Sequence, residues 1–383
     1  MAEAAPILVH IVSSRLWGGM ERYALDISRA FTDKGWTVEV FTRDSRAIDT
    51  MFARAGIKVH HAPLSGYFDV TTAYALMRFL RRSNRKVVIH THFYRDAFAA
   101  LLARKLARKS REQVRVVCTH HSCRPAREGK MMRRIYRNLD AFIFVSDLAR
   151  THFLSRWKED AIPFSQASIH TLHPTITTTS FPEYTPPPEK GPFTLLYLGR
   201  LSPEKGLEKL IATMALLKGK RIRLTIKGTG LADYVDSLQR LAVRSGVSNL
   251  IDWMGWDEKP IDAILNSHAA ICVSPTEEPF SMAALEIMAC GRTQIVPPNG
   301  AFSEILHPVN YSALSNGEVT DEKNVDSIRL DSLSEQEIAD ACLWLADHRD
   351  ICKEMGKNAL ANFQSRPGEK ETMQRLSTLY FPE

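Results

Sequence analysis

The sequence predicts an α/β protein of two domains, each built on a parallel sheet that helices cover. Its 383 residues are too many for one ordinary hydrophobic core, and they suit two domains of about 150–200 residues. Short apolar runs alternate with helical stretches, a pattern typical of parallel sheets with helices on both faces. A segment with five prolines, residues 181–192, divides the alternation into two series and is the predicted interdomain linker.

The first series defines a first domain over residues 1–180. A helical stretch at 20–34, with apolar residues at helical spacing, follows the first strand. The predicted strands of this domain are residues 7–12, 38–42, 58–61, 87–92, 114–120, 141–146 and 168–172.

The second series defines a second domain over residues 193–367. After Arg349 the pattern is helical, with a break at Pro367. The last helix, at about 370–380, has periodic apolar residues that suit packing on either domain. The predicted strands of the second domain are residues 193–198, 222–227, 250–254, 269–273 and 293–296.

The net charge of +7 is concentrated in residues 78–137, where eighteen Lys and Arg residues stand against three acidic ones. A basic region favours anionic partners such as phospholipid headgroups, phosphorylated glycans or nucleic acid. The alternative is that these basic residues lie on solvent-exposed helix faces and bind no partner. No apolar run reaches the ~18–20 residues of a membrane span, and the run at 7–12 is read as a strand rather than a signal peptide. The six cysteines show no C-x-x-C pairing, which indicates reduced, mostly buried thiols in a cytosolic protein.

The most informative segment, residues 274–291, reads SPTEEPFSMAALEIMACG. It follows a predicted strand and contains a turn at Pro279 before a predicted helix at 282–289. Such a turn directs backbone N–H groups and the positive end of the helix dipole at a bound anion. Glu278 and Glu286, with seven residues between them, are placed to hold hydroxyl groups while the amides hold phosphate. The segment therefore predicts a nucleotide-sugar site.

This segment resembles the E-x7-E signature of the retaining GT-B glycosyltransferases of glycosyltransferase family 4 (glycosyl transferases group 1). The resemblance implies two facing Rossmann-like domains with a deep cleft between them, the first for the acceptor and the second for the donor. It also implies that the C-terminal helix, about 368–383, packs back on the first domain. Glu286 would hold the nucleotide ribose and Glu278 the donor sugar, with the diphosphate beside the backbone of Phe280, Ser281, Met282 and Ala283. Ser281 replaces the family's glycine and is expected to crowd the phosphate turn.

Two cations follow the strand at 193–198, in the sequence GRLSPEKG of residues 199–206. Arg200 and Lys205 there match the family's G-R-x4-K-G pattern, and fixed cations near a helix start suit a diphosphate. The resemblance implies that they stabilise the charge that develops on the leaving diphosphate.

Two glycine pairs are further candidates for the donor site. Gly18 and Gly19 follow the first strand and permit close backbone approach to a ligand, although a tight turn explains them equally well. With Glu21 they are similar to the family's G-G-x-E loop. Gly228 and Gly230 resemble the family's G-x-G turn beside the nucleotide.

Histidines gather at two predicted strand ends, at 90–92 and 120–121. No carboxylate or cysteine set accompanies them in a metal-ligand pattern, and there is no D-x-D pair, so no metal site is expected. The family's strand-end histidine maps onto His121, which would orient the donor sugar. His120 competes for that role, because a slip of one residue reverses which side chain faces the ligand.

These observations predict a metal-independent hexosyltransferase that takes a sugar from a nucleotide donor, with a UDP-sugar as the expected co-substrate and no other cofactor. The expected acceptor is an anionic glycan or glycolipid of bacterial lipopolysaccharide core or another cell-surface polysaccharide. The enzyme is expected in the cytoplasm, peripheral on the inner face of the membrane through the basic region. Two alternatives stay open: an epimerase or phosphorylase on the same fold, and a nucleic-acid-binding protein. The basic region lacks the interleaved aromatic residues of a nucleic-acid surface, so nucleic acid is not the expected partner.

Overall fold

The computed structural model describes residues 4–158, 162–164, 168–176, 181, 183–256, 260–317 and 324–382. The chain forms two compact units, and each is an α/β unit as the sequence predicts. Unit 1 contains Met1–Ile176 and Gly368–Glu383, and unit 2 contains Thr177–Pro367. The predicted boundary at residue 180 and Pro182 of the predicted linker lie outside the described residues.

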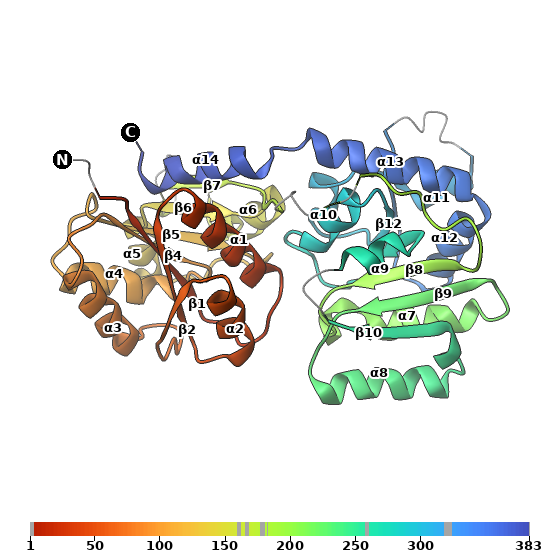
Figure 1. Cartoon of the computed structure of the whole chain (residues 1–383), viewed down its shortest axis with the longest axis horizontal. Coiled ribbons are helices and arrows are strands. Elements are labelled where there is room, and N and C mark those ends of the chain that lie inside the picture. Colours follow the sequence, from red (N-terminus) through yellow and green to blue (C-terminus); the bar gives the residue numbers. More distant parts are fainter. Residues whose placement is uncertain are drawn as a thin grey trace. The chain divides into compact units, whose positions relative to one another are not determined.

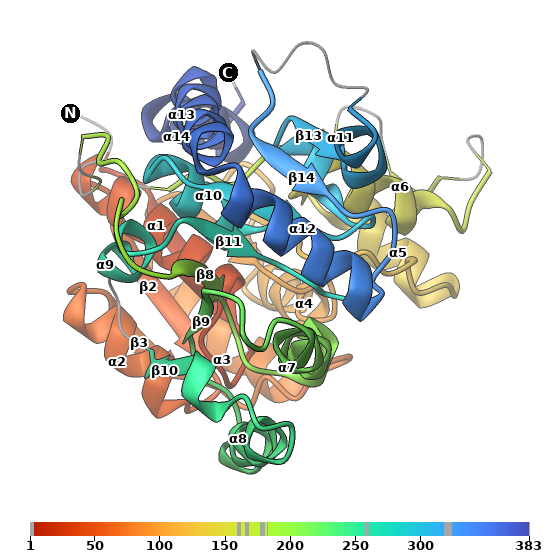
Figure 2. The ribbon, with the colours of Figure 1, turned by 90° about the vertical axis from the view of Figure 1, so that its right-hand side faces the viewer.

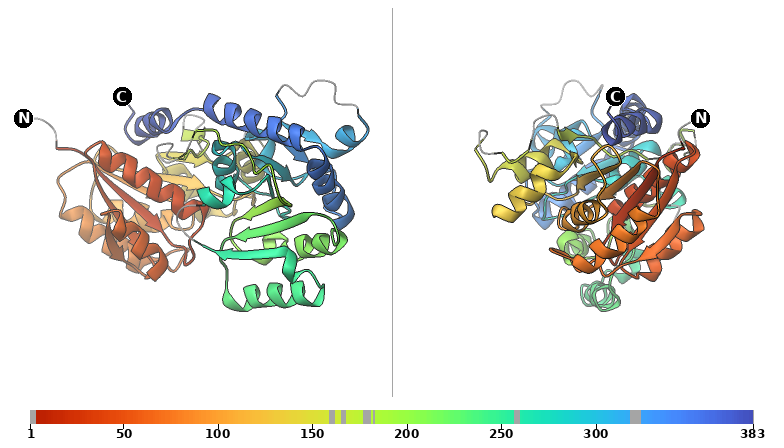
Figure 3. Two further views of the ribbon diagram at one scale, coloured as in Figure 1. Left: turned by 45° about the vertical axis from the view of Figure 1, so that its right-hand side comes forward. Right: turned by 90° about the vertical axis from the view of Figure 1, so that its left-hand side faces the viewer.

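Unit 1 is a seven-stranded sheet in the order β3-β2-β1-β4-β5-β6-β7, with every described strand pair parallel. Helices lie on both faces of this sheet (Figure 1 and Figure 3). Its elements are β1 (Ile7–Val12), α1 (Gly19–Asp33), β2 (Thr37–Thr42), α2 (Arg46–Arg54), β3 (Lys58–His61), α3 (Val70–Arg81), β4 (Val87–Thr91), α4 (Ala97–Leu106), β5 (Val114–His120), α5 (Lys130–Asn138), β6 (Ala141–Phe144), α6 (Asp147–Leu154), β7 (Ile169–Thr171) and α14 (Glu369–Tyr380).

Unit 2 repeats the topology, with the order β10-β9-β8-β11-β12-β14-β13 and parallel pairing throughout its described strands. Figure 2 shows helices flanking this sheet. Its elements are β8 (Phe193–Leu198), η4 (Pro203–Lys205), α7 (Leu207–Leu216), β9 (Ile222–Lys227), α8 (Ala232–Arg244), η5 (Ser248–Leu250), β10 (Ile251–Gly255), α9 (Ile261–Leu265), β11 (Ala269–Ile271), α10 (Met282–Ala289), β12 (Thr293–Val296), η6 (Ala301–Glu304), β13 (Pro308–Asn310), α11 (Tyr311–Ser315), β14 (Ser327–Arg329), α12 (Glu335–Asp347) and α13 (Arg349–Ser365).

Local sequence signals explain where several helices begin. The side chains of Asp69, Ser146 and Ser334 accept hydrogen bonds from backbone amides in the first turns of α3, α6 and α12. Such N-caps satisfy amides that have no intrahelical acceptor. The central strand of unit 1, β1, is buried at all six positions, as expected for a parallel sheet covered on both faces.

The C-terminal helix α14 packs on unit 1, one of the two placements that its apolar pattern permits. Met373, Leu376 and Tyr380 are buried in the core of that unit, and the ring of Tyr380 lies 5.1 Å from that of Phe31 on α1. In Figure 1 the helix lies beside the other elements of the unit.

The proline-rich segment is hydrogen bonded to unit 2. Arg292, whose side chain is fully buried, donates to the carbonyls of Thr185, Ser267 and Leu265 at 2.8 Å each. His268 Nε2 lies 2.8 Å from the carbonyl of Pro188. A buried guanidinium is stable only when its donors are satisfied, and the carbonyls satisfy those of Arg292. The bonds to Thr185 and Pro188 also hold the segment against the rest of the unit.

Two short strands, β13 and β14, extend the edge of the unit 2 sheet and were not predicted from the sequence. Asp326 joins them to α13, because its carboxylate accepts from the backbone of His307 at 2.8 Å and from Asn362 at 2.6 Å. Each of the two strands holds a single apolar residue between polar residues or proline, so neither forms an apolar run. Residues 318–323, between α11 and β14, lie outside the described residues. Among the helices that the structure describes, none combines the length and apolar character needed to cross a bilayer.

Four histidines are buried in unit 1: His10, His90, His92 and His120. Burial lowers the pKa of His10 to about 3 and that of His120 to about 4. The pKa values of His90 and His92 lie well below their usual range, because of burial first and then repulsion from neighbouring imidazoles. All four rings are therefore neutral near pH 7.

We expect unit 1 to lose stability as the pH falls below about 6.5, the pKa of an unfolded-state histidine. Below this pH the histidines of the unfolded chain become protonated, while the buried histidines of the folded unit stay neutral. Each buried histidine therefore lowers the free energy of unfolding by about 1–2 kcal/mol at pH 5. Urea unfolding at pH 7.5, 6.5, 5.8 and 5.0, followed by near-UV circular dichroism, measures this loss. His120→Phe is the matched variant, because it keeps an aromatic ring but cannot be protonated. Its free energy of unfolding should depend less steeply on pH, by the contribution of one proton. An unchanged pH dependence would contradict the neutral assignment.

Candidate functional site

Both sheets reverse their strand order between two central strands, β1 and β4 in unit 1 and β8 and β11 in unit 2. In open parallel sheets, ligands bind at the carboxyl ends of the strands at such a reversal, because the loops there diverge. The predicted site residues of unit 2 follow β8, β9 and β11, and those of unit 1 follow β1 and β5. Each unit thus brings its own candidates to one edge of its sheet.

In unit 2 the loop after β8 carries both predicted cations. Arg200 is exposed, and its backbone carbonyl accepts a hydrogen bond of 2.8 Å from the hydroxyl of Tyr197. The backbone amide of Leu201 donates to the carbonyl of Thr229 at 2.8 Å. Lys205 ends the short helix η4. The loop is therefore held by its backbone, which leaves the Arg200 side chain in solvent.

The loop after β11 is fastened to the same turn. Ser274 Oγ and Thr276 Oγ1 donate to the carbonyl of Glu204 at 2.9 Å and 3.0 Å. Gly206 is left-handed, with φ of +71°, and a Cβ built on it would lie 2.6 Å from the carbonyl oxygen of Val273. Only glycine fits that backbone and that space.

This interlock brings Lys205 and Glu278 together as an ion pair between Nζ and Oε1. The side chains are 22% and 13% exposed, so the pair is largely withdrawn from water. Residues that are 73 positions apart in the sequence thus form one charged centre.

Helix α10 begins beside this pair, with Ser281 as its N-cap. Ser281 Oγ accepts from the Ala284 amide at 3.2 Å, so the serine that replaces the family's glycine has a structural role. The amides of Met282 and Ala283 belong to the first turn, where N–H groups have no intrahelical acceptor and favour an anion. Phe280 and Glu286 are half-buried, with Glu286 in the second turn of the helix.

Gly228 and Gly230 are explained by backbone packing. A Cβ on Gly228 would lie 1.8 Å from the carbonyl oxygen of Gly199, and one on Gly230 would lie 1.9 Å from that of Leu201. The two glycines let the loops after β8 and β9 run against each other, so they support the Arg200 loop.

Sequence reasoning missed Gly300, which packs against the backbone of Glu278. Gly300 is left-handed, with φ of +90°, and a Cβ on it would lie 2.9 Å from the backbone nitrogen of Glu278. The amide of Ala301 donates to the Glu278 carbonyl at 2.8 Å. The Pro-Asn-Gly sequence at 298–300 is the turn signal that could have indicated it.

In unit 1 the loop after β1 leads into α1 through the predicted glycines. Gly18 is the N-cap of α1 with an extended backbone, and Gly19 is the first helical residue. Ser45 Oγ donates to the carbonyl of Arg15 at 2.9 Å and holds the loop.

A buried polar pair at the same edge was not predicted. Ser13 Oγ donates to Asp96 Oδ2 at 2.5 Å, and Arg95 Nη2 donates to Ser13 Oγ at 3.2 Å. Burial raises the pKa of Asp96 to about 6, against the lowering effects of Ser13 and Arg95. Ser13 follows β1, whereas Arg95 and Asp96 follow β4 more than 80 positions later in the sequence, which hides the cluster from motif reasoning.

The two adjacent histidines at the end of β5 have different surroundings. The ring of His120 is buried among aromatic rings, 4.7 Å from Phe153 and 5.9 Å from Phe144. His121 is only part-buried and lies 5.3 Å from the ring of Tyr23. His121, the residue expected to meet a ligand, is therefore the one that is accessible.

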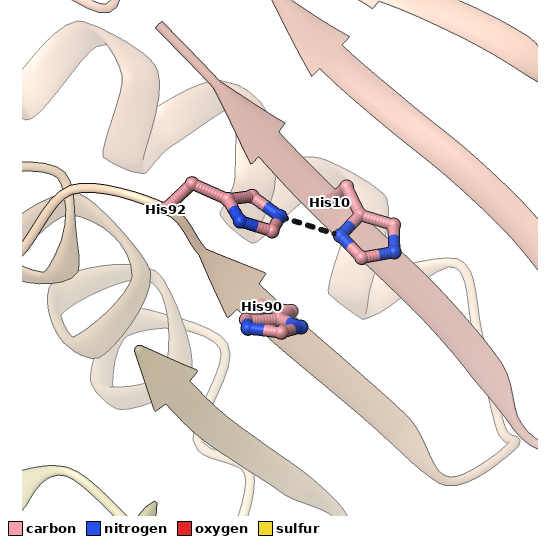
Figure 4. A group of neighbouring side chains, drawn as sticks. All are labelled: His10, His90 and His92. Carbon is pink, nitrogen blue, oxygen red and sulfur yellow. Dashed lines mark hydrogen bonds between the residues drawn. The ribbon is translucent and has the colours of Figure 1, made fainter. Parts of the chain in front are cut away.

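His121 continues a group of buried imidazoles on β1 and β4. His10 Nδ1 lies 2.9 Å from His92 Nε2 (Figure 4), and His92 Nδ1 lies 3.3 Å from His121 Nε2. His90 lies beside them, with its nitrogens 2.7 Å from the hydroxyls of Tyr380 and Thr119.

These rings meet one geometric condition for a metal site, since nitrogens of His10, His90 and His92 lie within 4.8 Å of one another. Both His90 nitrogens already face hydroxyl groups, however, and no carboxylate belongs to the group. A cation could bind these three rings only if the His10–His92 link and the hydrogen bonds of His90 were broken.

Comparison with known families agrees with this geometry. The sequence model for Glycosyltransferase Family 4 matches residues 17–179, and that for Glycosyl transferases group 1 matches residues 183–360. An uncharacterized glycosyltransferase of Methanocaldococcus jannaschii is 33% identical over 119 residues, 30% of each chain. D-inositol 3-phosphate glycosyltransferase of Pseudarthrobacter chlorophenolicus is 23% identical over 337 residues, 78% of this chain and 79% of that protein.

Solved structures show the same architecture. HepE of Anabaena, solved in complex with UDP and glucose, is similar with a TM-score of 0.77 and 16% identity, covering 98% of this chain and 99% of that one. The lipopolysaccharide outer core galactosyltransferase WaaB, in its apo form, is similar with a TM-score of 0.67 and 18% identity, again covering 98% and 99%. The chain therefore belongs to the group 1, family 4 glycosyltransferases and has the two α/β domains of the GT-B fold.

Proposed function

We propose that the chain is a retaining, metal-independent glycosyltransferase that takes a sugar from a nucleotide donor, with a UDP-sugar as the preferred donor. The observation that carries the proposal is the Lys205–Glu278 pair beside the N-terminus of α10, at the strand-order reversal of unit 2. A cation, a carboxylate and the first-turn amides of a helix in one place match the needs of a sugar diphosphate. HepE, solved with UDP and with UDP-glucose, supports the choice of nucleotide.

In the proposed donor site, different residues bind the diphosphate, the ribose and the sugar. The diphosphate would lie against the amides of Met282 and Ala283, with Arg200 and Lys205 as its cations. Glu286 would accept the ribose hydroxyls, one turn further along α10. Glu278 would accept hydroxyls of the sugar. For His121 the predicted role, from the family resemblance, is to orient the donor sugar.

The ion pair explains how the site changes when the donor arrives. Without a ligand, Lys205 neutralises Glu278. A diphosphate competes for the ammonium group, and the released carboxylate then becomes an acceptor for sugar hydroxyls. Binding of the phosphate thereby prepares the sugar subsite, and the cost of separating the pair is offset by the new phosphate contacts.

Transfer with retention needs no protein nucleophile in this scheme. The bond from the anomeric carbon to the diphosphate oxygen breaks, and the leaving phosphate accepts the proton of the acceptor hydroxyl on the same face. The new glycosidic bond forms at that face. Arg200, Lys205 and the α10 amides stabilise the charge that develops on the leaving group, a contribution often worth several kcal/mol.

The acceptor is proposed to be an anionic glycolipid, with lipopolysaccharide core as the leading candidate. WaaB supports this class as a structural neighbour, and the basic region of unit 1 supplies the charge. Not all of that charge is available: Arg104 is buried against Asp140, and Arg85 binds the carbonyls of Ala5 and Pro6. Helix α5 is different, because Lys130, Met131, Arg134 and Arg137 are exposed along it.

We infer that α5 brings the enzyme to the cytoplasmic face of an anionic membrane. Basic residues beside an exposed apolar side chain suit a phospholipid surface. An epimerase or phosphorylase on the same fold is the second candidate. An epimerase would ignore any acceptor, and a phosphorylase would need a phosphate site. A nucleic-acid-binding role is least favoured.

Donor binding is the first test. UDP-, GDP- and ADP-glucose are added at millimolar concentration to the wild type, Glu286→Ala and the control Glu371→Ala, whose carboxylate is exposed on α14. We expect UDP-glucose to raise the melting temperature of the wild type and the control but not of Glu286→Ala. Transfer to a lipopolysaccharide-core acceptor should then give a product with the anomeric configuration of the donor. No shift together with no transfer would refute the proposed function, and an inverted product would refute retention.

The Lys205 turn provides a second test through two glycines. Gly206 and Gly219 are both left-handed, with φ of +71° and +77°, but only a Cβ on Gly206 meets a neighbouring atom. Both alanine variants should lose about 1–2 kcal/mol of stability from backbone strain. Gly206→Ala should in addition displace Lys205 and weaken UDP binding at least about tenfold in calorimetry, while Gly219→Ala binds normally. Equal affinities for the two variants would contradict the role of this turn.

Membrane binding is tested with vesicles of phosphatidylglycerol and phosphatidylcholine. Each basic residue near an anionic surface contributes about 1 kcal/mol, so Lys130→Gln/Arg134→Gln should weaken partitioning about 30-fold. Arg240→Gln/Arg244→Gln on α8 removes two exposed charges at the same helical spacing and should bind like the wild type. Equal loss in both double variants, or none in either, would argue against docking through α5.

A further inference from the structure

The three imidazoles of His10, His92 and His121 form one continuous hydrogen-bonded chain from the buried strand β1 to the edge of the sheet. Its two links are His10 Nδ1 to His92 Nε2 at 2.9 Å and His92 Nδ1 to His121 Nε2 at 3.3 Å. The rings of His10 and His92 are also stacked, with centroids 5.1 Å apart (Figure 4). Only Nδ1 of His121 lies beyond the links at the outer end.

A chain of neutral imidazoles has few allowed proton arrangements. Burial lowers the pKa of His10 to about 3 and keeps those of His92 and His121 well below their usual range. Each ring then carries one N–H, and each link needs one donor and one acceptor. If His92 donates from Nδ1, His10 must donate from Nδ1 and His121 must accept at Nε2. If His92 donates from Nε2, both directions reverse. All three rings must therefore share the same tautomer.

The buried end of the chain decides between the two arrangements. His10 Nε2 is buried and has no hydrogen-bond partner among the residues that the structure describes, and in Figure 4 this nitrogen points away from His92. In the all-Nε2–H arrangement, that atom would be an N–H donor buried without an acceptor, which native structures rarely tolerate. In the all-Nδ1–H arrangement it carries only a lone pair.

We propose that His10 and His92 are positioning residues that hold His121 in the Nδ1–H tautomer, so that His121 presents a hydrogen-bond donor to the sugar. The tautomer claim rests on the geometry of unit 1 alone. The assignment of the sugar as the group that meets His121 rests on the proposed function. A sugar hydroxyl would then accept from Nδ1–H, and its own proton would remain free for another acceptor.

His90 does not belong to this chain, although its ring lies 4.6 Å from that of His92. Its nitrogens face the hydroxyls of Tyr380 and Thr119. These two hydroxyl groups, and not the other imidazoles, set the tautomer of His90. The bond to Tyr380 also holds α14 in place.

The test is a two-bond 1H–15N correlation spectrum of protein labelled with 15N-histidine, recorded at pH 7.5 and assigned with single variants. We expect the wild type to show the Nδ1–H pattern for His10, His92 and His121. His92→Asn keeps an N–H donor near the position of Nδ1 and should preserve the His121 pattern. His92→Leu should release His121 to a mixture of tautomers. His61→Leu changes an exposed histidine of the same unit and should alter nothing.

A His121 in the Nε2–H form, different tautomers among the three rings, or no response to His92→Leu would overturn the proposal. Zinc bound stoichiometrically to the purified protein and lost in His10→Leu would also overturn it, because a metal would occupy the nitrogens that form the links.

Kinetics with the UDP-sugar tests the role of the chain in transfer. His92→Leu should lower kcat/KM about tenfold, mainly through KM for the donor, and His92→Asn should restore most of it. Equal losses in the two variants would overturn the positioning role. If the wild type transfers no sugar, the proposed function fails, whereas the spectrum still decides the tautomer claim.

Discussion

The charged centre of unit 2 depends on one backbone contact, the close approach of the turn at Gly206 to the carbonyl of Val273. Because no side chain fits between them, the loops after β8 and β11 run against each other, and the Glu204 carbonyl gathers the hydroxyls of Ser274 and Thr276. Lys205 then meets Glu278. The charged centre is a consequence of packing between two loops. This packing fixes the positions of Lys205 and Glu278, although they are 73 positions apart in the sequence.

The two units share a strand order but differ in the chemistry at the reversal point. Unit 2 presents ionised groups beside a helix N-terminus, which suits an anionic ligand. Unit 1 presents neutral, buried imidazoles and the Ser13–Asp96 pair at the ends of β1, β4 and β5. One topology thus carries ionised groups at the edge of one sheet and neutral hydrogen-bonding groups at the edge of the other, and the identity of a few loop residues determines which.

Much of the fold could be read from the sequence, because a buried parallel strand is an apolar run with a clear start and end. The motif residues of unit 2 could be found for a related reason: Arg200, Lys205, Glu278 and Glu286 occupy two short segments. The strands β13 and β14 carry no periodic signal and are held by the side chain of Asp326. His10 stands alone in an apolar strand, and only the pairing of β1 with β4 brings it to His90 and His92. Gly300 and the Ser13–Asp96 pair are likewise products of tertiary contact.

The central claim is that UDP binds at the β8–β11 edge and takes Lys205 from Glu278. A crystal structure of the protein with UDP tests it most directly. We expect diphosphate oxygens within hydrogen-bonding distance of the Met282 and Ala283 amides, the ribose at Glu286, and an opened Lys205–Glu278 pair. UDP bound at another edge, or bound here with the ion pair intact, would contradict it.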